Sequence, residues 1–100
     1  MKMYILIKDS VPIGFAIVAA AHASLAAYLQ FKDSPAIQAW LAGSFYKVVC
    51  RVSPQEFERA KNFEDRVIIT ESALNHEEVA LAFKPREEWP KDFKFFRLFK

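Results

Sequence analysis

Few side chains in this sequence are suited to chemistry: two histidines, one cysteine and a short acidic segment. His76 lies in the stretch "ESALNHEE", with Asn75 before it and Glu71 at its start. A carboxylate and an imidazole can act as general base and acid, and loops at strand ends often carry such groups. An exposed turn is the simpler interpretation of this stretch, so both remain open.

His22 is the other histidine, in the uncharged stretch Gly14–Tyr28. On a helix, Ser24 would point about 200° away from His22, which excludes a nucleophile–base pair. We expect a hydrogen-bonded packing role for His22 rather than catalysis. Together with Glu71 and His76 it would form an acceptable set of metal ligands. Their spacing matches no local motif, however, so we predict no metal site.

Cys50 is the only cysteine, which excludes an intramolecular disulfide and a cysteine-rich zinc site. It lies in the strand-like run "KVVCRV" with no base nearby in the sequence. A free cysteine in such a run is typically a small buried hydrophobe. We therefore expect no nucleophilic role, and a reducing, cytoplasmic location.

The net charge is only +2, but the segment from residue 84 to residue 100 has six basic and three acidic residues. A basic segment of this kind can contact phosphates. The candidate contacts to phosphate or tRNA are Lys84, Arg86, Lys94 and Arg97. The alternative is a solvated edge on which lysines prevent aggregation. The phenylalanines of the same segment could stack on bases, but we expect them to pack in the core and at a dimer contact.

Hydrophobic patterns and turn residues predict four strands and three helices. The strands are expected at residues 3–8, 45–52, 66–71 and 78–84, and the helices at about 14–31, 35–41 and 54–62. Ser34 with Pro35 is typical of a helix start, and Ser53 with Glu56 forms a capping box. One further helical turn is expected at residues 86–89.

The stretch Ile13–Phe31 has nineteen residues without a formal charge, so it could be a membrane span, part of a signal segment, or a core helix. Its seven alanines contribute little transfer energy, and the stretch contains polar residues. Lys8 and Asp9 interrupt the pattern of a signal peptide. We predict a core helix whose alanines let it lie close to a sheet, and no contact with membranes.

The order of these elements predicts one α/β domain covering residues 1–100. Parallel neighbouring strands need crossover helices, whereas the six residues between the last two strands fit an antiparallel link. We therefore expect a three-layer sandwich, in which a small mixed four-stranded sheet has helices on both faces.

The motif "AAAHASLAAY" resembles the first helix of the type II, archaeal and eukaryotic, peptidyl-tRNA hydrolases. The similarity extends over the chain: "KMYILIKDS", "YKVVCRVS" and "RVIITES" resemble the family's first three strands, and "KP" followed by "FRLF" resembles its closing segment. The resemblance implies a compact α/β fold, a homodimer, and hydrolysis of the ester between peptide and tRNA without metal or cofactor.

The chain departs from the family pattern at the catalytic positions. The family's lysine and glutamine fall on Phe15 and Ala19, and its aspartate and threonine on Glu71 and Asn75. Phenylalanine supplies neither charge nor donor for developing negative charge. We therefore expect a protein without standard hydrolase activity that binds a small ligand or a partner. The expected cleft lies near Gly14, Phe15, Ala19 and His22. The alternative is an active hydrolase of peptidyl-tRNA that uses Glu71 or His76 with Asn75.

Overall fold

The computed structural model describes all residues from 1 to 100 and contains three α-helices and a five-stranded sheet. The elements in chain order are β1 (Met3–Lys8), α1 (Ile13–Phe31), α2 (Pro35–Ala42), β2 (Lys47–Val52), α3 (Pro54–Ala60), β3 (Arg66–Glu71), β4 (Glu77–Phe83) and β5 (Arg97–Leu98). Two short 3-10 helices, η1 (Ser72–Leu74) and η2 (Lys91–Phe95), precede β4 and β5. The predicted α/β class is confirmed, and the main elements lie within a few residues of their expected bounds.

The helix ends follow the local signals in the sequence. The Ser34 hydroxyl accepts a hydrogen bond from the Ile37 amide at 3.3 Å and so caps α2, which Gly43 ends. At α3 the capping box is complete, because the Glu56 amide donates to the Ser53 hydroxyl and the Glu56 carboxylate accepts from the Ser53 amide. These caps satisfy backbone groups that a helix end leaves unpaired.

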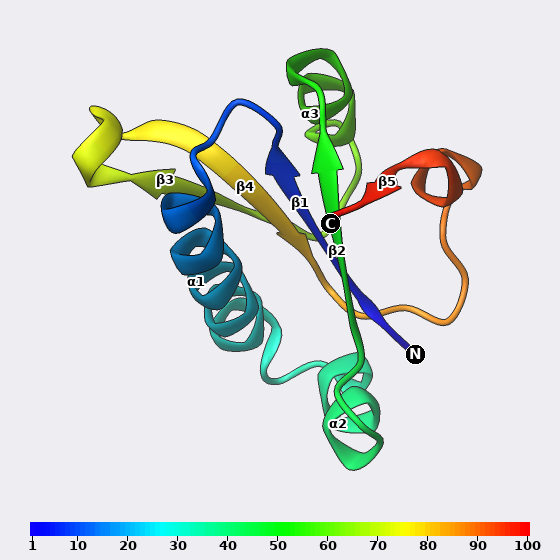
Figure 1. Ribbon diagram of the computed structural model, residues 1–100. Helices are drawn as coiled ribbons and strands as arrows, with labels where there is room; N and C mark the ends of the chain where they lie inside the picture. The colour runs from blue at the N-terminus through cyan, green and yellow to red at the C-terminus, as the bar shows by residue number, and fades with distance from the viewer.

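The sheet has the order β3-β4-β1-β2-β5, with β1 and β2 parallel and the other pairs antiparallel (Figure 1). The prediction of four strands was wrong by one, because the two-residue β5 adds to the free edge of β2. The helical turn expected at residues 86–89 is also absent. Arg86 instead exchanges backbone hydrogen bonds of 3.1 and 3.2 Å with Lys2, which holds the segment extended.

Each face of the sheet has its own hydrophobic core. On one face α1 buries Ala16, Ala19, Ala23 and Ala27 against alternate residues of the strands, among them Ile5. The opposite face packs the remaining alternate residues against aromatic and small side chains from α3, η2 and the C-terminal segment. Figure 1 shows α1 and α3 leaving opposite sides of the sheet. The alanines place the α1 backbone close to the strands, as predicted.

The outer side of α1 remains in solvent. Ile17, Leu25 and Leu29 are 66%, 58% and 55% exposed. By length and composition α1 would suffice to cross a membrane, a property that buried core helices also have. Its four alanines are nevertheless fully enclosed against the sheet. One side of α1 therefore belongs to the core, and the other side exposes several large apolar residues.

Candidate functional site

The three candidate catalytic residues lie together at the tip of the β3–β4 hairpin. The Glu71 carboxylate accepts a hydrogen bond from the Ala73 amide at 3.1 Å, so it caps η1. Asn75 and His76 have φ angles of 56° and 58°, and both are exposed. The His76 amide donates to the Glu71 carbonyl at 2.9 Å, which brings the two residues together, but neither of the two cavities in the structure is lined by them.

The expected cleft on α1 is filled rather than open. Phe15 is half-buried and packs against the α1-side core, to which Leu74 of η1 also contributes, and Ala19 is 1% exposed. Gly14 lies on another side of the helix, because it precedes Phe15 by one residue and thus by about 100°. None of these three residues lines a cavity. An aromatic ring therefore occupies the place where the resemblance implies a lysine.

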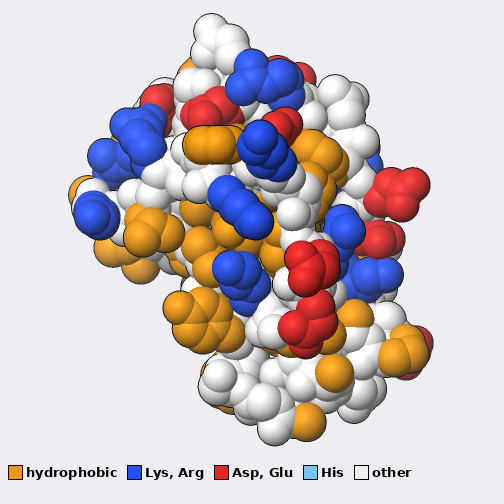
Figure 2. Space-filling view, turned by 90° about the vertical axis from the view of Figure 1, so that its right-hand side faces the viewer, with side chains coloured by type: hydrophobic (Ala, Val, Ile, Leu, Met, Phe, Trp, Pro, Cys, Tyr) orange, Lys and Arg blue, Asp and Glu red, His pale blue; other side chains and the backbone are white.

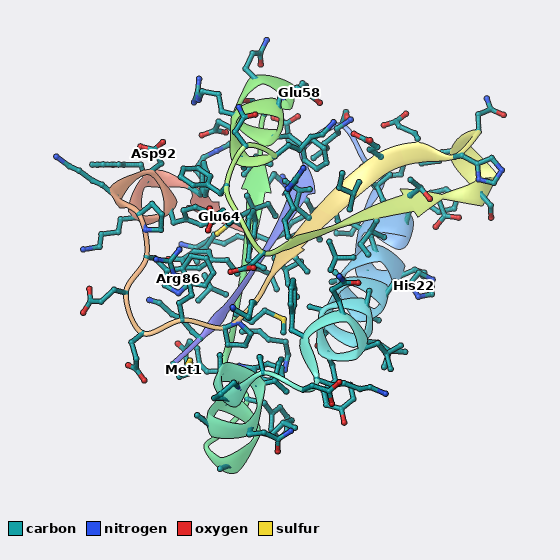
Figure 3. All side chains as sticks on the ribbon, turned by 180° about the vertical axis from the view of Figure 1, so that it is seen from behind. Met1, His22, Glu58, Glu64, Arg86 and Asp92 are labelled. Atoms are coloured by element: carbon teal, nitrogen blue, oxygen red, sulfur yellow. The ribbon has the colours of Figure 1, made fainter.

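His22 has no packing role, and that expectation was wrong. The residue is exposed and its side chain makes no hydrogen bond. It belongs to the outward side of α1, since Ala19 and Ala23 on either side occupy the core positions. In Figure 3 it projects from α1 into solvent. No three metal-ligating side chains gather anywhere in the structure.

The four candidate phosphate contacts do not form one patch. Lys84 pairs with Asp65 at 3.2 Å, and Arg97 pairs with Asp9 at 3.6 Å. Arg86 stacks over Trp89 and lies across the molecule from His22 (Figure 3). Lys94 is exposed on η2 and makes no ion pair. Figure 2 shows Lys and Arg side chains spread over an apolar background on the side of the C-terminal segment.

The aromatic residues of this segment mainly build the core beneath it. Phe93 is 1% exposed and packs edge-on against Tyr4, Phe63 and Phe83. Only Phe95 is largely exposed, at 72%. The packing interpretation of the C-terminal phenylalanines is therefore confirmed for Phe93.

Cys50 is buried in β2, as expected of a small hydrophobe. Burial, together with the nearby Glu56 carboxylate and against an opposing effect of Lys2, raises the pKa of its thiol to about 11. The thiolate is the nucleophilic form of cysteine. At neutral pH Cys50 is thus an inert thiol.

The larger cavity is a groove that the sequence analysis missed. It has a volume of about 340 Å³ and lies where α1, α2 and the start of β2 meet. Its wall on α1 is formed by Ala21, Ser24, Leu25 and Tyr28, and its other wall by Trp40, Leu41, Phe45 and Lys47. The volume falls within the range of small-molecule sites, and an apolar lining with a few polar groups is typical of them.

One cation lies at this groove. The Lys47 ammonium is 4.8 Å from the Phe45 ring centroid and 5.4 Å from that of Trp40, and it donates to the Phe45 carbonyl at 2.9 Å. No carboxylate pairs with it. Hence the groove combines an apolar body with an uncompensated positive charge.

The backbone of this wall is strained. Phe45 has a φ of 37°, which is unfavourable for a bulky residue. Its amide donates to the Trp40 carbonyl at 3.1 Å, and the Trp40 indole donates to the Tyr46 carbonyl at 2.8 Å. These two bonds hold the Phe45 ring edge-on to Trp40. Strain of this kind concentrates at functional sites.

The sequence did contain a signal for the groove. Residues 34–46 carry no formal charge yet include Trp40, Leu41, Phe45 and Tyr46, and Lys47 follows directly. Trp40 is buried, but Leu41, Phe45 and Tyr46 remain 39%, 53% and 59% exposed. Comparisons with known protein families and with curated proteins find no match for this chain.

Proposed function

We propose that this protein binds a small amphipathic anion in the α1–α2–β2 groove and has no standard peptidyl-tRNA hydrolase activity. Its architecture is that of a three-layer, type II peptidyl-tRNA hydrolase-like sandwich. The observation that carries the proposal is the apolar groove with the unpaired Lys47 ammonium at its wall. A carboxylate would accept from Lys47 while an apolar chain lies against Leu25, Tyr28 and Leu41.

We expect octanoate to bind this groove more tightly than the uncharged 1-octanol. Replacing Lys47 by glutamine removes the charge, so octanoate affinity should fall about 3- to 10-fold, whereas 1-octanol affinity should not change. The measurement is quenching of Trp40 fluorescence in a Trp89→Phe background. Lys32→Gln, which removes an exposed lysine outside the groove, is the control. Equal losses in the two variants would refute the assignment of Lys47.

The hydrolase alternative is favoured by the proximity of Glu71 and His76 at the hairpin tip. We expect no release of tRNA from peptidyl-tRNA by the wild-type chain, since Glu71 already caps η1 and Phe15 fills the place of the lysine. The measurement is a gel assay for freed tRNA. Turnover that Glu71→Gln abolishes would establish the alternative in its place.

We propose that the protein is a homodimer in the cytoplasm. The family resemblance implies the dimer, and the exposed side of α1 suits one. Val18, Leu25 and Leu29 follow one another at helical spacing and lie outward, opposite the buried alanines. An exposed apolar ridge of this kind, here interrupted by His22, marks an interaction surface. We propose that two copies of α1 pack together along it, so that Leu25 lies at the shared border of the interface and the groove.

A further inference from the structure

A second binding position follows from the topology of the sheet. β1 and β2 are adjacent and parallel, yet the helix after β1 packs on one face and the helix after β2 packs on the other. Figure 1 shows that the segments that follow β1 and β2 diverge beyond the ends of these strands. In open α/β sheets ligands bind outside the carboxyl ends of the strands at such a point of divergence.

Two arginines lie directly opposite one another near this point. Arg51, the penultimate residue of β2, pairs in register with Arg97 of β5, so both side chains project from the same face. Like charges in this arrangement repel and destabilise a sheet. The only carboxylate at the pair is Asp9, 3.6 Å from Arg97. The pair therefore retains a net positive charge.

The environment of Arg51 orients its guanidinium and leaves one of its donors without a partner. Its guanidinium carbon is 4.4 Å from the centroid of the Phe99 ring, which fixes its plane. Its Nε–H is buried and has no acceptor within the protein. A buried donor without a partner costs free energy and calls for an explanation in the structure. α1 packs on β1, β3 and β4 rather than on β2 and β5, and at this position Arg51 is half-buried while Arg97 is 64% exposed.

From these observations we propose that Arg51 and Arg97 bind the terminal phosphate of a phosphorylated small molecule. Guanidinium groups offer planar pairs of donors that match phosphate oxygens. The dianion would neutralise both arginines and relieve their repulsion. This position lies at the opposite end of β2 from Lys47, about 13 Å along the strand. It is thus separate from the groove and independent of the proposed function.

The test is calorimetric titration with inorganic pyrophosphate at low salt. We expect wild type to bind it, and Arg51→Gln and Arg97→Gln each to weaken binding at least ~10-fold. Asp9→Asn should strengthen binding, because it removes the carboxylate that competes for Arg97. Lys94→Gln, which removes the same charge from the exposed side of η2, should change little. If Lys94→Gln weakens binding as much as Arg97→Gln, net charge explains it and the site is refuted.

Two further measurements distinguish a terminal-phosphate site from a folding defect and from an RNA-binding surface. Arg97 is 64% exposed, so its variant should fold, and pyrophosphate should raise the thermal midpoint of wild type but not of Arg97→Gln. A single-stranded RNA lacking terminal phosphates should bind more weakly than pyrophosphate. Arginine-dependent binding of that RNA without binding of pyrophosphate would overturn the terminal-phosphate assignment.

Discussion

Replacing Ala23 by leucine is expected to lower the free energy of unfolding by about 1–3 kcal/mol. Ala23 is 0% exposed at the centre of the four alanines that α1 presses onto the sheet. Three additional carbon atoms there would force the helix away from the strands and loosen its neighbours Ala19 and Ala27. Urea denaturation followed by circular dichroism measures the change.

Ala21→Leu is the matched control for this prediction. It makes the same substitution on the same helix two residues earlier, at an exposed position. Because alanine and leucine have similar helix propensities, we expect a change within about 0.5 kcal/mol. If Ala23→Leu were as mild as Ala21→Leu, α1 would not lie close to the sheet, and its interpretation as a core helix would fail.

The sequence predicts best those features that nearby residues determine. Ser34 and Ser53 mark helix starts because each caps amides within three residues of itself. The four buried alanines of α1 recur at intervals of three or four residues, which one helix face requires. For the same reason β1, β3 and the capping box were located to the residue.

Features that depend on distant partners were missed. The extended backbone at Arg86 exists because Lys2, at the other end of the chain, supplies its hydrogen bonds. β5 is only two residues long and is a strand solely because β2 offers a free edge. Neither partner is visible in a local window of sequence.

The candidate site also depends on residues that are distant from one another in the sequence. The family resemblance points to Phe15 and Ala19, but a substitution alone does not tell whether a cleft stays open or fills. The Phe15 ring packs into the core, and a groove exists instead along the second half of α1, from Ala21 to Tyr28. That groove combines three elements, and its cation comes from the first residue of β2. The position of Lys47 at a groove therefore becomes visible only when α1, α2 and β2 are placed together in the fold.

The second large effect is expected on dimerisation through the exposed ridge of α1, which Val18, Leu25 and Leu29 form. Introducing glutamate at Val18 or Leu29 is expected to raise the dimer dissociation constant at least ~100-fold, because two unpaired carboxylates would be buried in each symmetric dimer. Sedimentation velocity over a range of concentrations measures the shift. Both positions lie on the outward side of α1 and outside the groove.

A glutamate at Gln55, exposed on α3, adds the same charge away from the ridge and should leave the mass unchanged. Octanoate titration of the ridge variants then separates dimerisation from ligand binding, since neither Val18 nor Leu29 lines the groove. A wild-type chain that sediments as a monomer at every concentration would refute the dimer. The ridge would then need a different binding partner, whereas the proposal that the groove binds an anion through Lys47 would still stand.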